Sequence, residues 1–360
     1  MRYSWLAAGA AAVLALGVTA CGSSDSSSSS SKSGGSLTGA GSTFVAPFYS
    51  ELASQIKSKD GLTVNYNPVG SGAGVAQFTQ KTVDFGGNDS TLKPEEVTAA
   101  KTAGGSDPVQ IPTVLGAITI SYNVSGVEKG LKLDGATIAD IFNGKITKWN
   151  DSAIASQNSG VNLPSTDITT CHRSDSSGTT KGFTTYVAIY DPTWEKKIGV
   201  DKTVKWPGGT GAKGNDGVAA CVKQNEGAVG YVEEAYALQN NFDTAAVKNK
   251  SGAYIAPTLE STSAAGDGVE VAADNTFSPL DSPNPKAYPI TSTTYMLLWQ
   301  DACKAGQSKE TATGGQTFAS FALGEGQSIA KQLYYAPLPS NIQSQAQKSV
   351  DGLQCNGSAL

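Results

Sequence analysis

The chain has 360 residues, with 26 Lys and Arg against 31 Asp and Glu, which gives a net charge of −5 at pH 7. This negative balance excludes the broad basic surface that nucleic-acid binding needs. A single histidine leaves no histidine pair for acid/base catalysis and no histidine-rich metal site. Charged residues make up 16% of the chain, below the usual figure of about a quarter, and glycine is abundant. This composition is typical of an exported protein with many tight loops.

The N-terminal segment has the features of an export signal. Arg2 precedes an apolar run at residues 5–16, which is shorter than the ~20 residues that a membrane-spanning helix needs. The run is followed by Val-Thr-Ala and then Cys21, which resembles the lipobox of bacterial lipoproteins. The resemblance implies a signal peptide at residues 1–20 and a lipid on Cys21. An ordinary signal peptide that contains a cysteine is the alternative.

Residues 21–35 are dominated by serine. They have too few apolar side chains to form a core, so we predict a disordered tether. Together, a lipid on Cys21 and this tether predict an extracytoplasmic protein anchored to the outer face of the bacterial cell membrane.

The four remaining cysteines indicate two disulfides, because an even number is typical of exported chains. Three pairings are open. We favour Cys171 with Cys221 and Cys303 with Cys355, since each pair then lies within one half of the chain. CxxC spacing is absent, so we expect no zinc site.

Strand and helix patterns alternate after residue 36. Apolar residues spaced by four, from Phe44 to Ile56, predict an amphipathic helix that follows a short turn at residues 36–41. The further expected strands lie at residues 62–66, 83–87, 112–124, 168–172, 228–232 and 295–299. The further expected helices lie at 75–79, from Pro94, around 138–142, around 183–190, at 216–222 with Asp216 as cap, and at 317–322 and 329–333, which end the chain. The alternation predicts an α/β fold, and the length favours two lobes joined by crossing strands.

Three glycine- and serine-containing loops precede predicted helices. They are residues 41–44 (Gly-Ser-Thr-Phe), 70–74 (Gly-Ser-Gly-Ala-Gly) and 176–179 (Ser-Ser-Gly-Thr). A helix N-terminus offers free N–H groups and a partial positive charge, and glycine allows a ligand to approach the backbone closely. One such loop alone is usually an ordinary helix cap. Three that converge would enclose an anion.

Arg173 lies directly before the third loop, and Asp175 is two positions further on. Residues two apart on a strand share a face, so Asp175 would hold the guanidinium while Arg173 binds an oxyanion through two N–H groups. A surface ion pair is the alternative. The only histidine, His172, is expected to be a neighbour of Arg173 rather than a catalytic base. Nucleotide-binding and hydrolase motifs are incomplete or absent.

A wider set of motifs points to one family. The motifs are Gly39 to Phe44, Asp84 to Gly86 with Asp89, Arg173 to Thr179, Val204 to Pro207, Gly214 to Gly217, Gly227 to Glu233 and Pro289 to Thr294. Together they resemble the periplasmic phosphate-binding proteins of Pst-type ABC transporters, and the resemblance covers residues 37–340. It implies a two-lobed periplasmic-binding-protein fold of type II with two crossing hinge strands.

The resemblance also implies the lobes and the site. Lobe 1 would be residues 36–112 plus 290–360, and lobe 2 would be residues 113–289, with phosphate bound between them. The implied phosphate ligands are Thr43, the backbone N–H of Phe44, Ser71, Asp89, Arg173, Ser177, Gly178 and Thr179, with Asp175 behind Arg173. Such a protein acts as a monomer without a cofactor, catalyses nothing, and delivers phosphate to permease subunits that work with a cytoplasmic ATPase.

Asp89 distinguishes between possible anions. Phosphate keeps at least one O–H at neutral pH, which a carboxylate accepts, whereas sulfate keeps none and would be repelled. A binding protein for sulfate or molybdate is therefore the less favoured alternative. A phosphatase that uses a Ser or Thr nucleophile in the same loops is a further alternative, but metal ligands and a free base are missing.

Overall fold

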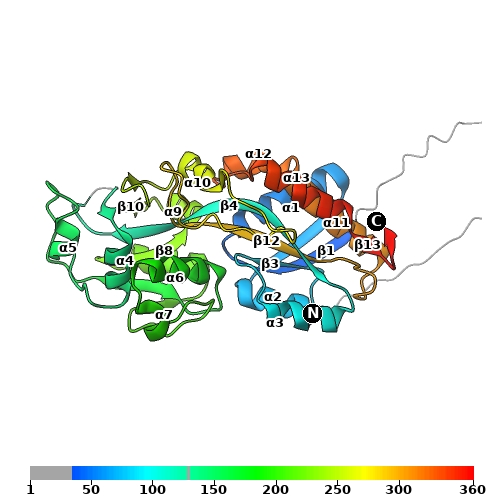
Figure 1. Cartoon of the computed structure of the whole chain (residues 1–360), viewed down its shortest axis with the longest axis horizontal. Helices are drawn as coiled ribbons and strands as arrows, with labels where there is room; N and C mark the ends of the chain where they lie inside the picture. Colours follow the sequence, from blue (N-terminus) through cyan, green and yellow to red (C-terminus); the bar gives the residue numbers. More distant parts are fainter. Residues whose placement is uncertain (1–34, 128–129) are drawn as a thin grey trace, which may run out of the picture. The chain divides into compact units, whose positions relative to one another are not determined.

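The computed structural model describes residues 35–127 and 130–360 (Figure 1). The expected signal peptide at 1–20, the lipid site at Cys21 and the tether up to residue 34 lie outside the described residues. The strands are β1 Ser36–Gly41, β2 Thr63–Pro68, β3 Phe85–Asn88, β4 Pro108–Asn123, β5 Lys132–Leu133, β6 Thr169–Arg173, β7 Thr210–Ala212, β8 Ala228–Glu233, β9 Asp243–Thr244, β10 Ala246–Lys248, β11 Tyr254–Ile255, β12 Thr291–Trp299, β13 Gln354–Cys355 and β14 Ser358–Ala359. The helices are α1 Ala46–Asp60, α2 Ser71–Thr79, α3 Pro94–Gly104, α4 Gly135–Phe142, α5 Ser152–Ala155, α6 Gly178–Tyr190, α7 Trp194–Lys197, α8 Gly214–Gln224, α9 Glu234–Gln239, α10 Leu259–Gly266, α11 Lys309–Leu323, α12 Gly326–Gln332 and α13 Ser340–Asp351.

The main sheet has the strand order β2-β1-β3-β12-β4-β8-β6-β7, with β9 also paired to β4. Strands β1, β2 and β3 are parallel to one another, and β6 is parallel to both β7 and β8. The long strand β4 belongs to two half-sheets. Its residues 108–117 pair with β12 in the first half-sheet, and its residues 118–123 pair with β8 in the second. The predicted α/β fold is confirmed.

Strands β4 and β12 run side by side between the two half-sheets (Figure 1). Residues 110–122 of β4 and every residue of β12 are buried, as the apolar and β-branched composition of both strands requires. They are the crossing strands that the sequence predicts. Gly116 in β4 has no room for a side chain, because a Cβ there would lie 2.5 Å from the ring of Phe44. The segment before α1 therefore packs directly on the crossing strand.

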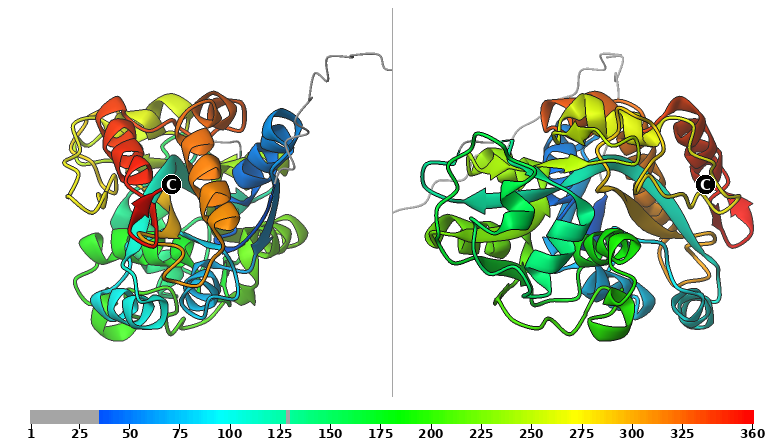
Figure 2. Two further views of the ribbon diagram at one scale, coloured as in Figure 1. Left: turned by 90° about the vertical axis from the view of Figure 1, so that its right-hand side faces the viewer. Right: turned by 60° about the vertical axis from the view of Figure 1, so that its left-hand side comes forward.

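Helices cover both faces of the first half-sheet (Figures 1 and 2). Helices α1, α11 and α12 contact one another, and α13 contacts α11. Helices α2 and α3 form a second group that packs together. The predicted apolar stripe of α1 is buried, including Phe48, Leu52 and Ile56. In the second half-sheet, the rings of Phe183 and Tyr231 stack with centroids 4.4 Å apart. None of the helices in the described ranges is long and apolar enough to cross a membrane.

Several local predictions were wrong. Residues 36–41 form strand β1 rather than a turn, because pairing to β2 and β3 on both sides outweighs the weak strand preference of its glycines. Helix α2 already begins at Ser71, inside the glycine-rich segment that was expected to be a loop. Asp216 lies in the first turn of α8, which has Lys213 at its N-cap. The chain ends with α13 and a small hairpin after the last predicted helix.

Two disulfides link distant parts of the chain in the favoured pairing. Cys171 of β6 is bonded to Cys221 of α8, and Cys303, after β12, is bonded to Cys355 of β13. The paired residues are separated by 50 and 52 positions, so each bond restricts a long loop in the unfolded chain.

We expect the double variant C303S/C355S to lower the free energy of unfolding by about 2–4 kcal/mol, because the unfolded chain regains the entropy of the open loop. Denaturant unfolding of the variant and of the oxidised wild type measures the difference. Wild-type protein treated with a reductant serves as a control. Unchanged stability of the variant would show that the bond adds nothing beyond the native packing.

Candidate functional site

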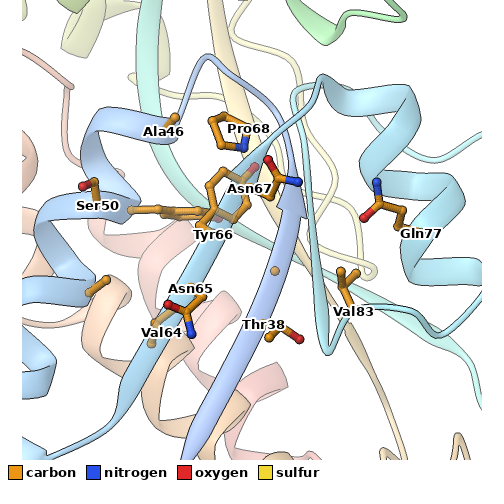
Figure 3. A pocket seen from close by; sticks show the side chains of 13 residues that line it. Thr38, Ala46, Ser50, Val64, Asn65, Tyr66, Asn67, Pro68, Gln77 and Val83 are labelled. Carbon is orange, nitrogen blue, oxygen red and sulfur yellow. The ribbon is translucent and has the colours of Figure 1, made fainter.

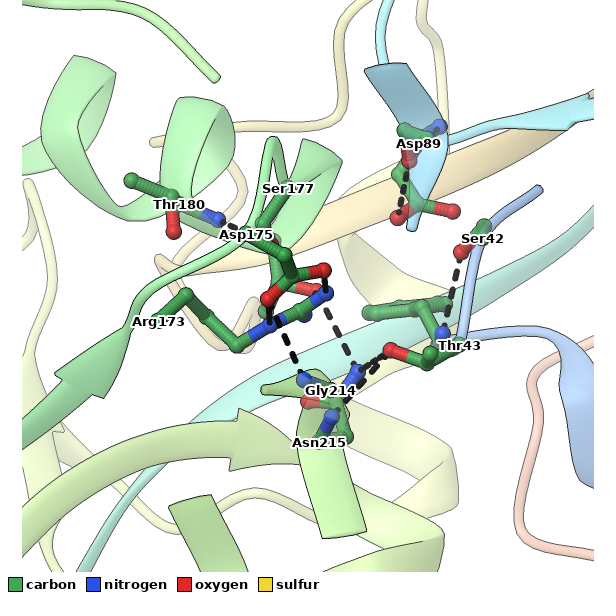
Figure 4. Close-up of polar contacts among 12 residues, drawn as sticks. Ser42, Thr43, Asp89, Arg173, Asp175, Ser177, Thr180, Gly214 and Asn215 are labelled. Carbon is green, nitrogen blue, oxygen red and sulfur yellow. Dashed lines mark hydrogen bonds and ion pairs between the residues drawn. The ribbon is translucent and has the colours of Figure 1, made fainter. Parts of the chain in front are cut away.

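The predicted site residues come together from five segments of the chain (Figure 4). Thr43 and Phe44 follow β1, Ser71 begins α2, Asp89 follows β3, Arg173 ends β6, and residues 177–179 begin α6. The strand β1 is parallel to β3, so their loops meet at one edge of the first half-sheet. Loops at the carboxyl ends of parallel strands are the usual place for a ligand in open α/β sheets. Thr43, Ser71, Asp89, Arg173, Ser177 and Thr179 are all buried.

Arg173 is held in one orientation by Asp175. Its Nε donates to Asp175 Oδ1 at 2.7 Å and its Nη2 donates to Oδ2, while Nη1 lies 3.4 Å from Thr179 Oγ1. Although burial raises the pKa of Asp175, the bonds and charge of Arg173 outweigh it and lower that pKa overall. Asp175 accepts from two of the five guanidinium N–H groups and Thr179 from a third, so two remain available.

Thr43 is oriented by a residue that the sequence analysis did not assign to the site. The backbone N and the Nδ2 of Asn215 both donate to Thr43 Oγ1, at 3.1 and 2.9 Å. Because this oxygen already accepts two hydrogen bonds, its own O–H is left to donate elsewhere. Asn215 is fully buried, and its Oδ1 accepts from the backbone N of Glu233. The sequence signal that could have identified Asn215 is its position in the motif Gly214 to Gly217, at the start of α8.

Asp89 is a buried acceptor among hydroxyl groups. Thr294 Oγ1 donates to its Oδ1 at 2.7 Å, and Ser71 Oγ donates to its Oδ2 at 3.1 Å. Burial raises the pKa of Asp89, while these hydroxyls and the charge of Arg173 act in the opposite direction. The carboxylate and the guanidinium are therefore close enough to influence each other inside one buried site.

The three predicted loops differ in how they use their polar groups. Ser177 is the N-cap of α6, because its Oγ accepts from Thr180 N at 3.1 Å. The N–H of Phe44 donates to Ser42 Oγ at 2.9 Å. Gly178 allows close contact between loops, since a Cβ there would lie 2.6 Å from both Asp89 Cβ and Ser71 Oγ. The third loop thus packs tightly against the second loop and against Asp89.

Hydrogen bonds join the loops of the two half-sheets around the site. Besides the contacts between Asn215 and Thr43, Tyr236 OH donates to the backbone O of Thr43 at 2.6 Å. The backbone N of Gly72 donates to the backbone O of Ser176 at 2.9 Å. The described structure therefore has its site loops closed on one another.

Among the pockets lined by described residues, two bear on the choice of a binding site. A pocket of about 580 Å³ lies between α1, α2 and the edge strand β2, where Tyr66 and Asn67 line it (Figure 3). Of the described residues lining this pocket, none carries a charge, so it is a poor site for an anion. A smaller pocket of about 200 Å³ is lined by Asp89, Lys181 and Ser292, directly beside the buried cluster. Among the described residues, no three His, Cys, Asp or Glu side chains are grouped to hold a metal ion.

Comparison with known proteins agrees with this geometry. A family model described as the PBP superfamily domain matches residues 26–325. The phosphate-binding protein PstS of Xylella fastidiosa is 39% identical over 312 residues, which cover 86% of this chain and 83% of that protein. PstS of Pasteurella multocida is 38% identical and covers 90% of this chain and 93% of its own length. The chain belongs to the PstS family of phosphate-binding proteins.

Solved structures share the fold at lower identity. A high-affinity periplasmic phosphate-binding protein, solved with phosphate bound, has a TM-score of 0.71 at 22% identity over 89% of this chain and 99% of its own. A phosphate-binding protein from Stenotrophomonas maltophilia has a TM-score of 0.65 at 21% identity, covering 87% of this chain and 93% of its own. These neighbours establish the periplasmic-binding-protein fold that the sequence predicts.

Glu233 lies behind the site, where β8 meets the crossing strand β4. Tyr335 OH lies 2.6 Å from the backbone O of Phe44 and 3.1 Å from Glu233 Oε2. The tyrosine has one proton, which the shorter contact assigns to Phe44. Glu233 Oε2 also accepts from the backbone N of Ala235 at 2.9 Å, so its contact with Tyr335 OH is the weaker of its two hydrogen bonds. Burial first and the charge of Glu234 second raise the pKa of Glu233 well above its usual value.

We expect Glu233→Gln to stabilise the protein increasingly as the pH rises. The folded-state pKa of Glu233 is raised, so above the unfolded pKa only the unfolded chain ionises, and the wild type loses up to about 1.4 kcal/mol per pH unit. Glutamine keeps a side-chain oxygen that accepts from the backbone N of Ala235 and does not ionise. Urea unfolding of both proteins at about pH 5 and about pH 8 measures the difference. Parallel pH profiles would show that Glu233 is ionised in the folded state.

Proposed function

We propose that this protein binds inorganic phosphate in the buried site between its two half-sheets and delivers it to the permease of a phosphate ABC transporter. The observation that carries the proposal is the presence of one buried guanidinium, from Arg173, and one buried carboxylate acceptor, from Asp89, among hydroxyl donors. The relatives that match most of the chain are named phosphate-binding proteins, which supports the same ligand.

The cationic side of the site would bind the phosphate oxygens. Arg173 supplies the charge, and Thr43 supplies an O–H that Asn215 directs away from itself. The N–H groups at the start of α6, at Gly178 and Thr179, complete a set of donors at a positive helix end. Charge-assisted hydrogen bonds each contribute about 1.5–3 kcal/mol, so a set of them compensates for the desolvation of the anion.

The acidic side of the site would select for a protonated anion. Asp89 accepts a hydrogen bond from the O–H that phosphate keeps at neutral pH. Sulfate has no such proton and would place an oxygen against the carboxylate in a buried site. Binding of sulfate or molybdate is therefore disfavoured by the same residue that favours phosphate.

Calorimetric titration tests both parts of the proposal. We expect the purified protein, freed of endogenous phosphate, to bind phosphate and arsenate and to reject sulfate by about 10⁴-fold, as sites built around a ligand O–H do. Asp89→Asn replaces one carboxylate oxygen with an N–H₂ donor, so the rejection of sulfate should fall steeply. Equal sulfate exclusion by wild type and variant would overturn the role of Asp89. Failure of the wild type to bind phosphate would overturn the function itself.

Asn215→Asp tests the orientation of Thr43. The new carboxylate accepts hydrogen bonds where the amide donated one, so the Thr43 O–H turns toward it and away from phosphate. We expect phosphate affinity to fall by at least about tenfold, which corresponds to one lost hydrogen bond to a charged group. The control is Thr43→Ala, measured alone and in combination with Asn215→Asp. The double variant should lose less binding free energy than the sum of the losses in the two single variants, because both substitutions affect the same hydrogen bond to phosphate. Full additivity would show that Asn215 acts independently of Thr43.

The lobes and the anchor belong to the same proposal. Residues 36–112 plus 290–360 would form lobe 1 and residues 113–289 lobe 2, with β4 and β12 as the connection along which they move. Cleavage after residue 20 and a lipid on Cys21 would hold the protein on the outer face of the cell membrane through residues 21–35. It would meet the permease there as a monomer. The protein acts by binding and release, and no catalytic step is required of any residue.

A further inference from the structure

Two ion pairs join the half-sheets through side chains that are not among the proposed phosphate ligands. Lys93 Nζ lies 2.6 Å from Asp201 Oδ2, and Lys202 Nζ lies 2.9 Å from Glu96 Oε1. Lys93 and Glu96 belong to the start of α3, in the first half-sheet, whereas Asp201 and Lys202 follow α7, in the second. We call these four residues the clasp. Each half-sheet contributes one lysine and one carboxylate, so both ion pairs form together in only one alignment of the two segments.

Both arms of the clasp are tied to the site. The segment with Lys93 begins at Asp89, and its geometry is fixed by a capping interaction in which the backbone N of Lys93 donates to Glu96 Oε2. On the other arm, the backbone O of Lys202 accepts from the backbone N of Ser177 at 2.9 Å. The clasp therefore connects the loop that carries Asp89 with the loop that carries Ser177.

The two pairs differ in their exposure to solvent. The side chains of Lys93 and Asp201 are each 40% exposed, so salt and water weaken this outer pair. The side chain of Lys202 is only 6% exposed, and that of Glu96 is 23% exposed. Removing Glu96 would leave the Lys202 ammonium buried without a partner, which is costly. This cost arises only while the half-sheets are in contact, since an open cleft returns both groups to water.

We propose that the clasp sets the lifetime of bound phosphate by holding the cleft shut, although its side chains are not among the proposed phosphate ligands. The inference rests on the proposed function. Opening must break both ion pairs before phosphate leaves, whereas phosphate enters an open cleft in which the pairs are not yet formed. Loss of the clasp therefore raises the dissociation rate more than it lowers the association rate.

Glu96→Gln is the first test, because glutamine keeps the capping interaction with the backbone N of Lys93 and removes only the charge. Stopped-flow measurement with phosphate should show dissociation about tenfold faster, with association within about twofold of wild type. Lys93→Gln should accelerate dissociation by about two- to threefold, since its pair is more exposed. Lys101→Gln is the matched control: it breaks the exposed pair of Lys101 with Asp107, which does not cross between half-sheets.

A charge reversal distinguishes an effect of the ion pair itself from a general structural effect of substituting these residues. Lys93→Glu places two carboxylates together and should accelerate dissociation more than Lys93→Gln does. Adding Asp201→Lys restores an attractive pair, so the double variant should return to within about threefold of the wild-type rate. Thermal unfolding of each variant without phosphate checks that folding is intact.

The outcomes distinguish this inference from the function on which it rests. Wild-type binding of phosphate together with unchanged dissociation rates in Glu96→Gln and Lys93→Glu would overturn the clasp and leave the function standing. Faster dissociation without rescue by the double variant would also overturn it, because the effect would then not depend on the ion pair. Absence of phosphate binding by the wild type would overturn the function first, and the clasp with it.

Discussion

The site depends on one buried positive charge whose direction is fixed. Arg173 ends β6, its backbone N donates to Tyr231 OH, and its side chain is bound by Asp175. A buried guanidinium without this partner would be strongly destabilising, and a mobile one would bind an anion poorly. Asp175 also accepts from the backbone N of Gly214, so it joins the start of α8 to the arginine. The arrangement of the second half-sheet around the anion site follows from this ion pair.

Against that charge, the first half-sheet places groups that respond to protons. Asp89 stands among Thr294 and Ser71, and its raised pKa reflects a balance between burial and those hydroxyls. In the second half-sheet, burial raises the pKa of Glu233 well above its usual value, which favours its neutral form. Under the proposed function, an acidic protein can thus surround an anion with carboxyl groups. Asp175 is paired with a cation, Asp89 would accept a proton from the ligand, and the raised pKa of Glu233 favours its neutral form.

The connection between the half-sheets relates the proposed binding site to opening and closing of the cleft. Strands β4 and β12 provide a continuous hydrogen-bonded link, so the halves remain joined whether or not the site loops are in contact. Around the site, contacts such as those of Asn215 and Tyr236 with Thr43 depend on closure. The same holds for the clasp. A ligand that binds only the closed arrangement shifts the population toward it, and the ion pairs add to that shift.

The sequence by itself determined the α/β alternation, the glycine- and serine-containing helix starts and the pairing of Arg173 with Asp175, because each depends on residues close in the chain. It favoured the observed disulfides only because each pair then lies within one half of the chain. It did not identify β1, whose glycines become a strand only through neighbours on both sides. Nor did it assign roles to Asn215 and Glu233 or find the clasp. Those roles exist only when segments more than 100 residues apart meet, since a hydrogen bond or ion pair is decided by distances of a few ångströms that local patterns do not encode.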